Sequence, residues 1–212
     1  IIGESDSIHQ YSLSTAYDVS TATYSNVSKS ISSWESSPNA LTFNNDGTRL
    51  YFAGAASSHI NEYRLTSAYD LSSASYNQRY NVGIVTNGLA FNSNGTKMFV
   101  VNASSNVVNV YTLGTGFDVS TASYSTNLSI ASQDTSAQGI KFNSNGTKMF
   151  IIGDAGDDIN EYSLSTGFDI STASFQGSLS VSSEESEPQG LAFNSDGSKM
   201  FVIGKSGDDI NE

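Results

Sequence analysis

Almost the whole 212-residue chain is one pattern that returns about every fifty residues. The phrase LTFNNDGTRLYF, which begins at Leu41, recurs with small changes from Leu89, Ile140 and Leu191. A second phrase, INEYRLTSAYDLSSASY in its clearest copy, follows with the same step in each unit. Self-similarity at a fixed period indicates a repeat architecture, in which each unit buries its apolar surface against its neighbours.

Each unit reads as four short β-strands. The first, Leu41–Phe43 in one unit, is followed by Asn45-Asp46-Gly47, a sequence typical of a tight hairpin turn. The second strand is apolar at every position, as in 50–53, 98–101, 149–152 and 200–203. A strand with one wet face alternates apolar and polar residues, so these strands are expected to be covered on both faces.

The third and fourth strands of each unit become progressively more polar. Tyr63 and Leu65 alternate with Ile60 in the third strand, and the fourth is rich in Ser, Thr and Asn. A gradient from apolar to polar strands is what a propeller blade requires. Between these strands lies a repeated D-[VLI]-S-[TS]-A phrase, whose Asp is expected to fix a turn. No segment has a sustained helical period, which predicts an essentially all-β chain.

Two stretches resemble a known repeat family. PQGLAFNSDGSKMFV, at Pro188–Val202, is similar to YVTN and WD40-like β-propeller repeats. EYSLSTGFDISTASF, at Glu161–Phe175, resembles tandem repeats of marine phage and bacterial proteins without a defined role. The resemblance spans all four units and implies a β-propeller of four-stranded antiparallel blades. It implies little about activity, because propellers host many unrelated functions.

The units predict one propeller array over residues 1–212. Three blades are expected at about 38–85, 86–136 and 137–187, with a fourth formed by 188–212 together with 1–37. The chain starts and stops inside a blade, which suggests a fragment of a longer array. Joining its ends would remove two strand edges that otherwise invite aggregation. A four-bladed ring from one chain and an eight-bladed homodimer remain equal alternatives.

The composition of the chain argues against several classes of function. The chain has 21 acidic and nine basic residues, a net charge of −12, which argues against nucleic-acid binding. It has no cysteine, so thiolate catalysis and disulfides are excluded, and no apolar run is long enough for a membrane helix. No nucleophile elbow, phosphate loop or dinucleotide fingerprint is present.

The acids are unevenly distributed over the predicted blades. Loops joining strands two and three share a rim with the linkers between blades, and that rim is expected to be negative. Twelve of the 21 acids fall there: Glu4, Asp6, Glu35, Asp134, Asp154, Asp157, Asp158, Glu184, Glu185, Glu187, Asp208 and Asp209. The pairs Asp157-Asp158 and Asp208-Asp209 are candidate ligands for Ca²⁺, which prefers oxygen donors. The alternative is a solvated acidic surface.

Trp34, the single tryptophan, lies in a linker on the same predicted rim. It is a candidate contact for a sugar or a peptide, and the alternative is packing over a blade junction.

These features favour a binding or scaffold module of a secreted, cell-surface or phage structural protein. It would need no cofactor, with Ca²⁺ as the candidate ion, and a protein or glycan as its ligand. One alternative is a propeller hydrolase or lactonase with a metal in the central channel, although only Thr42 and Lys141 are polar in the first strands. Another is a repeat spacer without a ligand.

Overall fold

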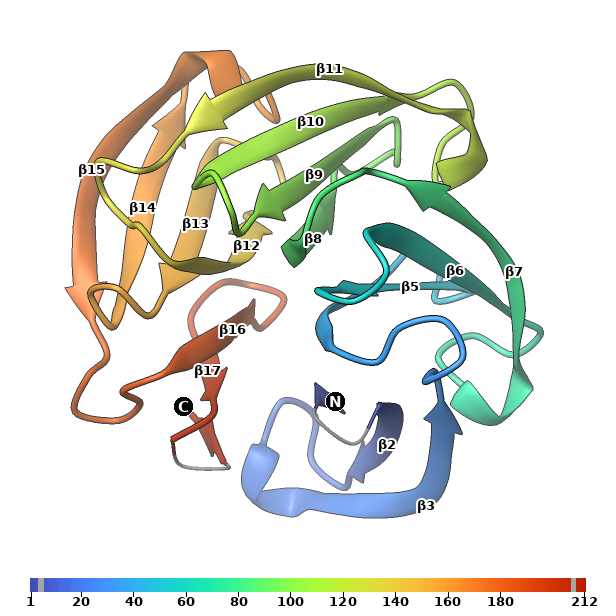
Figure 1. Cartoon of the computed structure of the whole chain (residues 1–212). Helices are drawn as coiled ribbons and strands as arrows, with labels where there is room; N and C mark the ends of the chain where they lie inside the picture. Colours follow the sequence, from blue (N-terminus) through green and yellow to red (C-terminus); the bar gives the residue numbers. More distant parts are fainter. Residues whose placement is uncertain (4–5, 207–208) are drawn as a thin grey trace.

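The computed structural model describes residues 1–3, 6–206 and 209–212, which form an all-β structure. Five antiparallel sheets stand around a central axis, and Figure 1 views them along it. Three sheets have four strands, and the first and last sheets have three. The fold is therefore the β-propeller of four-stranded antiparallel blades that the sequence predicts.

Each complete blade runs from an inner strand beside the axis to an outer strand, in sequence order. The first blade consists of β4 (Pro38–Phe43), β5 (Arg49–Gly54), β6 (His59–Leu65) and β7 (Ala74–Asn81). The second consists of β8 (Thr86–Phe91), β9 (Lys97–Asn102), β10 (Val107–Leu113) and β11 (Ala122–Ser129). The third consists of β12 (Ala137–Phe142), β13 (Lys148–Gly153), β14 (Asp158–Leu164) and β15 (Ala173–Ser180).

The second strand of each complete blade is buried on both faces, which confirms the prediction from its continuous apolar run. Phe52 in β5, Phe99 in β9 and Ile151 in β13 are fully buried. Neighbouring sheets supply the cover, because Phe99 and Ile151 belong to one apolar cluster between the second and third blades. The outer strands β7, β11 and β15 are mostly exposed, so polar side chains there face water.

The loops between the third and fourth strands are single 3₁₀ turns: η1 (Val19–Thr21), η2 (Leu71–Ser73), η3 (Val119–Thr121) and η4 (Ile170–Thr172). Before each turn, an Asp side chain accepts a hydrogen bond from the backbone N–H two residues later, as Asp118 does from Ser120 at 3.1 Å. This confirms the turn role predicted for the repeated Asp. The described residues hold no helix of the length and apolar character that a membrane crossing requires.

Glycine is required where neighbouring blades meet at the axis. A Cβ atom on Gly88 in β8 would lie 2.9 Å from Cγ2 of Val101 and 3.1 Å from the carbonyl oxygen of Gln138. On Gly139 in β12 it would lie 2.8 Å from Cγ2 of Ile152 and 3.2 Å from the carbonyl oxygen of Gln189. The inner strands can therefore approach one another only because these two positions lack a side chain.

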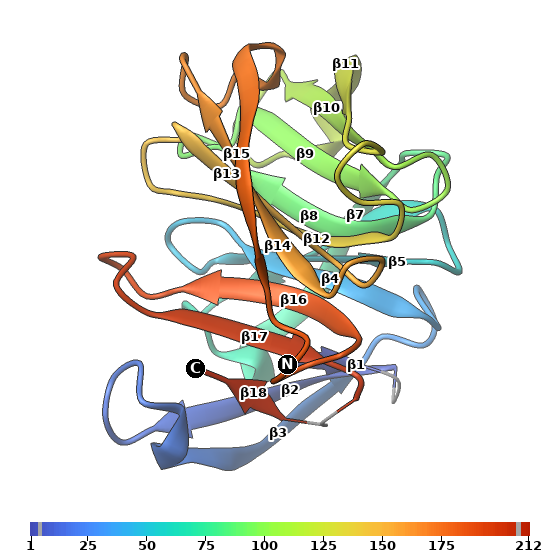
Figure 2. The same cartoon turned by 90° about the vertical axis from the view of Figure 1, so that its left-hand side faces the viewer.

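The two ends of the chain form separate sheets, which lie next to each other around the axis (Figures 1 and 2). The first contains β1 (Ile2–Gly3), β2 (Ser7–Leu13) and β3 (Ala22–Ser30). The last contains β16 (Pro188–Phe193), β17 (Met200–Gly204) and β18 (Ile210–Asn211).

This differs from the single fourth blade expected from residues 188–212 and 1–37. The edge of β2 that β17 would need is paired with β1, with Ile2 opposite Ile8. The corresponding edge of β17 is paired with β18, with Ile203 opposite Ile210. In the first sheet, β1 therefore takes the place beside β2 that β17 would have filled. In the last sheet, β18 takes the place beside β17 that β2 would have filled. Closure of the ring, within one chain or between two, stays a prediction.

The contact between inner strands gives the first testable prediction. Gly88→Ala is expected to lower the free energy of unfolding by about 2 kcal/mol, because the new methyl group overpacks the junction of β8 with β12. Gly177→Ala in β15 is the matched control, since a Cβ there meets nothing within 4 Å. The control is expected to raise stability by about 0.5 kcal/mol, and denaturant unfolding measures both. Equal effects of the two substitutions would contradict the close approach.

Candidate functional site

Three acids predicted on the negative rim are buried rather than exposed to solvent. Glu35, Asp134 and Glu185 are 1%, 2% and 1% exposed. Each occupies the same place in its linker, directly after the turn that follows an outer strand. The sequence predicted that all twelve rim acids contribute to a negative surface. For Glu35, Asp134 and Glu185 this prediction is wrong, because their side chains are buried. The three acids stand at the same position in the repeat, two residues before Ser37, Ser136 and Glu187. This repeated position is the sequence feature that indicates a shared structural role.

Glu35 shows what a buried carboxylate does at this position. Its Oε1 accepts hydrogen bonds from the backbone N–H groups of Ser37 at 2.8 Å and Ala56 at 3.0 Å. Its Oε2 accepts from the backbone N–H of Ser57 at 3.1 Å and from the Ser57 hydroxyl at 2.8 Å. The carboxylate therefore joins the linker before β4 to the loop between β5 and β6. Glu185 makes the corresponding bonds to the N–H groups of Glu187 and Ser206.

Asp134 is one methylene shorter and makes fewer bonds. Its Oδ1 accepts from the Ser136 N–H at 2.6 Å, whereas its Oδ2 is buried without a hydrogen-bond partner among the described residues. Burial raises the pKa of the Asp134 carboxyl, and the nearby carboxylates of Asp158 and Asp154 raise it further. Asp134 is thus the least well satisfied member of the three.

A small residue in the second strand makes room for each buried acid. A Cβ on Gly54, Gly153 or Gly204 would clash with the carboxylate of the acid in the same blade. The second blade has a shorter linker without an acid, and Asn102 stands at the corresponding position. There the Asn102 Oδ1 accepts from the Ser104 N–H at 3.0 Å, so an amide on the strand replaces the carboxylate of the linker.

Asp157 and Asp158 have local roles in the loop before β14. Asp157 adopts a left-handed backbone conformation with φ of 46°, as Ser58 and Asn106 do at the equivalent positions. Its carbonyl oxygen accepts from the Val181 N–H at 2.7 Å. Asp158 accepts at Oδ1 from the Asn160 amide at 2.7 Å. Asp and Asn tolerate the left-handed region, so backbone geometry accounts for the first Asp of the pair.

Only one residue of the second predicted pair lies among the described residues. Asp209 is exposed and accepts at Oδ1 from the Asn211 amide at 2.9 Å, while Asp208 lies outside the described residues. Among the residues that the structure describes, no three His, Asp or Glu side chains come together as a metal site would need. The assignment of the two pairs as Ca²⁺ ligands therefore stays a prediction.

Trp34 is half-buried, and one face of its ring is covered. It stacks on Tyr76 of β7, with ring centroids 3.6 Å apart and planes 2° from parallel. The indole packs over the edge of the first blade beside a cluster that contains Ile31 and Phe52. The role of Trp34 as a contact for a sugar or a peptide stays a prediction.

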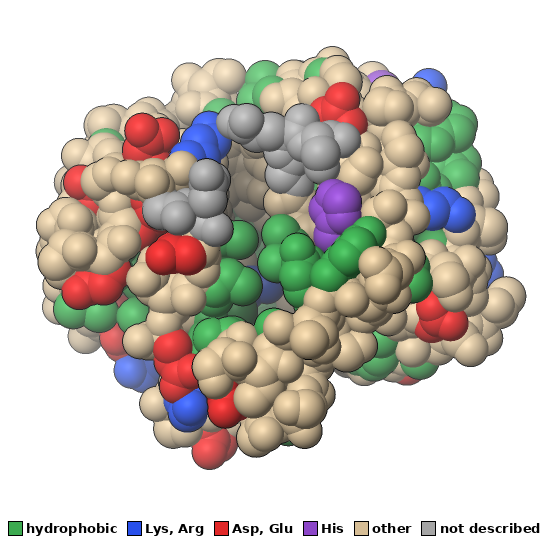
Figure 3. Space-filling view, turned by 90° about the horizontal axis from the view of Figure 1, so that it is seen from below, with side chains coloured by type: hydrophobic (Ala, Val, Ile, Leu, Met, Phe, Trp, Pro, Cys, Tyr) green, Lys and Arg blue, Asp and Glu red, His purple; other side chains and the backbone are tan. Residues whose placement is uncertain are grey.

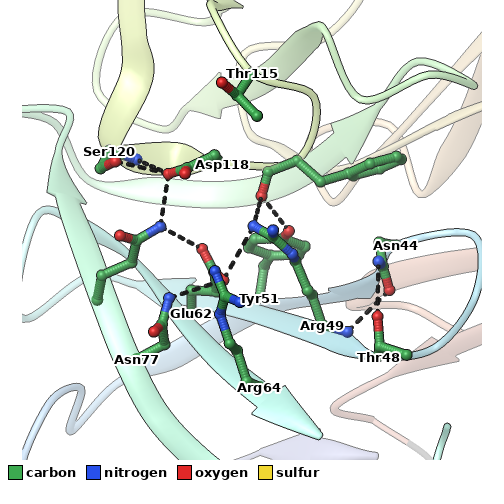
Figure 4. A network of polar contacts seen from close by, with 12 residues as sticks. Asn44, Thr48, Arg49, Tyr51, Glu62, Arg64, Asn77, Thr115, Asp118 and Ser120 are labelled. Carbon is green, nitrogen blue, oxygen red and sulfur yellow. Dashed lines mark hydrogen bonds and ion pairs between the residues drawn. The ribbon is translucent and has the colours of Figure 1, made fainter.

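A buried polar network lies on the opposite side of the first blade and joins it to the second (Figure 4). Glu62 of β6 is fully buried and contacts Arg49 Nη1 at 3.3 Å and Arg64 Nε at 3.6 Å. The Gln78 amide donates to Glu62 at 2.7 Å and to Asp118 at 2.8 Å. Burial is the main cause that raises the pKa of the Glu62 carboxyl, and these donors oppose it.

Arg49 and Tyr51 extend this network across the blade junction. Both donate to the carbonyl oxygen of Phe117, at 2.8 Å and 2.6 Å. In strand register, Arg49 lies opposite Arg64, and Tyr51 opposite Glu62. The sequence did not single out Glu62, because its proximity to Arg49 becomes apparent only when the strands are aligned. The network holds two blades together, so its role is structural.

A cavity of about 880 Å³ lies at the axis. Inner strands β4, β8, β12 and β16 contribute to its wall, together with Ile2 of β1 and residues of β17. Figure 3 shows a hollow that is lined mainly by hydrophobic side chains. The volume falls in the range of small-molecule sites in proteins.

Neither a family model nor a curated protein sequence matches the chain. Solved structures do resemble it. A functionally unknown protein from Desulfotomaculum acetoxidans matches 96% of this chain and 58% of its own, with 13% identity and a TM-score of 0.57. The periplasmic gluconolactonase PpgL of Pseudomonas aeruginosa matches 82% of this chain and 48% of its own, at 16% identity and a TM-score of 0.52.

A third similar structure is the β-propeller domain of Cps50 (Swd1) from Myceliophteria thermophila. It matches 82% of this chain and 52% of its own, at 10% identity and a TM-score of 0.52. The chain thus spans about half to three fifths of the proteins it resembles. At such identities the likeness shows the β-propeller fold alone.

The buried carboxylates give a stability prediction. Glu35→Ala is expected to lower the free energy of unfolding by about 3 kcal/mol, because it leaves buried N–H donors of the linker and the loop without an acceptor. Glu184→Ala is the control, since Glu184 is exposed in the equivalent linker, and its effect should stay within about 0.5 kcal/mol. Denaturant unfolding measures both. A neutral Glu35→Ala would contradict the role assigned to the carboxylate.

Asp134 gives a prediction about pH. Its pKa is raised in the folded chain, so the folded state binds more protons than the unfolded state above about pH 3.9, and stability falls as pH rises through that window. Asp134→Asn removes this loss. The variant is therefore expected to be more stable than the native chain at pH 7, with the advantage disappearing at low pH. Thermal unfolding at several pH values measures it, and a pH-independent difference would refute the assignment.

Proposed function

We propose that the chain is a non-enzymatic binding or scaffold module, which contacts its partner through the rim formed by the linkers and the loops between strands two and three. The observation that supports this proposal is a contrast between the two rims within one chain. The hairpin turns of the opposite rim read NNDGT, NSNGT, NSNGT and NSDGS in the four units. The 3₁₀ turns on that side also keep their Asp cap in every copy.

The proposed binding rim varies between units in length and charge. Its loops contain Ala55–Ser58 in one blade, Ala103–Asn106 in the next and Asp154–Asp157 in the third. The linkers vary as well, because 82–85 is shorter than 31–37, 130–136 and 181–187. A fixed framework with varied loops on one face is the usual arrangement of a binding surface.

Charge favours a basic partner. After the three buried acids are set aside, Glu184, Glu187 and Asp209 remain exposed on this rim. Clustered charge of one sign attracts an oppositely charged partner and speeds its association. A protein segment rich in Lys or Arg is therefore the proposed ligand, and a glycan is the alternative.

The proposal also covers the oligomeric state of the chain and its cellular location. A second copy of the chain that completes the propeller would bury the exposed edges of the first and last sheets. An extracellular or surface-associated location fits the acidic, Ser- and Thr-rich surface.

The alternative is an enzyme of the propeller lactonase kind. The similarity to a gluconolactonase supports this reading as much as the other similar structures support a binding module. An assay of gluconolactone hydrolysis with added Ca²⁺ or Zn²⁺ separates the two. Metal-dependent turnover would favour the enzyme over the binding module.

Binding of a fluorescent octalysine peptide tests the rim. The double variant Glu184→Gln/Glu187→Gln is expected to weaken binding about threefold or more, because it removes two exposed rim carboxylates. Its matched control is Glu161→Gln/Glu212→Gln, which removes two partly exposed carboxylates paired with Lys148 and Lys199. Fluorescence anisotropy at low and physiological salt measures the affinity.

If both double variants weaken the peptide equally, attraction follows the net charge of −12 and the rim has no special role. If the native chain does not bind the peptide, the acidic rim is a solvated surface and the proposed partner class is wrong.

A further inference from the structure

The axial cavity differs in charge from the rest of the molecule. The chain carries 21 acids and nine bases. Yet among the described residues the cavity wall contains Lys141 and Lys205 and no Asp or Glu. Lys205 is exposed at the opening, whereas Lys141 belongs to the inner strand β12. A strongly acidic protein thus has an axial cavity whose described charged side chains are cationic.

Lys141 has no counterpart in the other units. Thr42, Ala90 and Ala192 stand at the equivalent inner-strand positions, so the fold does not need a cation there. Lys141 lies opposite Phe150 in register, and the Phe150 ring contacts Phe193 of the last sheet. The lysine stem therefore lies on the side of β12 that faces β16.

The ammonium group of Lys141 has no partner among the residues that the structure describes. None of the hydrogen bonds or ion pairs of the described residues involves its Nζ. Burial lowers the pKa of this amine, and no neighbouring carboxylate offsets that cost. Gln189 also lines the cavity, and its Nε2 is buried without a hydrogen-bond partner among the described residues. The Lys141 side chain is half-buried, so its ammonium remains accessible to a ligand in the cavity. An anionic ligand is one way to supply the counter-charge that the protein does not.

The remainder of the wall is largely apolar. Leu41, Leu89, Ile140 and Leu191 from four inner strands contribute to it, together with Phe201 of β17. Figure 3 shows this apolar character in the hollow between the first and last sheets. The volume of about 880 Å³ accommodates a small organic molecule.

We propose that the axial cavity binds a small amphipathic carboxylate, with its head group on the Lys141 ammonium and its apolar body against the side chains of the inner strands. Charge complementarity selects this occupant, because a neutral apolar molecule would leave the ammonium unpaired. The site is separate from the acidic rim, so this proposal does not depend on the proposed function.

Titration calorimetry with octanoate and octan-1-ol tests the proposal, because the two probes share their apolar chain and differ in the carboxylate. The native chain is expected to bind octanoate at least about tenfold more tightly than octan-1-ol, as expected for a charged partner of a buried ammonium. Lys141→Met is expected to abolish that preference, and Lys141→Arg to retain most of it. Lys148→Met is the control, since Lys148 is half-exposed and already paired with Glu161.

A second readout follows the amine itself. Octanoate is expected to raise the pKa of Lys141, which NMR of the side chain measures, because a bound carboxylate favours the charged form. Thermal unfolding of Lys141→Met checks that the variant is folded. If the native chain does not bind octanoate, or if Lys141→Met keeps the preference for it, the proposal is wrong. Either result leaves octalysine binding at the rim unaffected, so the two proposals fail independently.

Discussion

The structure depends on burial of both faces of the second strand in each blade. Side chains such as Phe52, Phe99 and Ile151 are covered only when another sheet stands on either side. Burial of apolar surface is the main favourable term in folding, and no single sheet of this chain could achieve it alone. The sheets must therefore stack around an axis, and Gly88 and Gly139 let their inner strands approach closely enough.

Polar contacts then fix how the blades meet. On one rim, the buried carboxylates of Glu35 and Glu185 join each linker to a loop of the blade that follows. On the other side, Glu62 and Arg49 hold the first two blades together through the carbonyl oxygen of Phe117 and through Gln78. These groups lie where apolar packing ends. Glu35 and Glu62 each accept hydrogen bonds from several donors, which offsets the cost of burying their charge, whereas Oε2 of Glu185 has no partner among the described residues.

The outer surface and the axial cavity differ in the charge of their side chains. Exposed carboxylates lie on both rims, as Glu184 and Asp46 do, whereas the described wall of the axial cavity contains Lys141 among apolar side chains. A solvated carboxylate costs little, but a half-buried ammonium group without a counter-charge favours a negative partner. The two regions therefore have different chemistry, and each is suited to a different class of ligand.

The sequence by itself determined the repeat, the four strands of each blade, the tight turns and the Asp-capped 3₁₀ turns. These features depend on residues close together in the chain, and four copies of each pattern make them reliable. Only the tertiary structure decided that Glu35, Asp134 and Glu185 are buried, that Trp34 stacks on Tyr76, and that the two ends form separate sheets. Burial and stacking depend on which segments distant in sequence lie side by side, and the pairing of the ends depends on which strand edge is already occupied. The spacing of residues along the chain specifies neither.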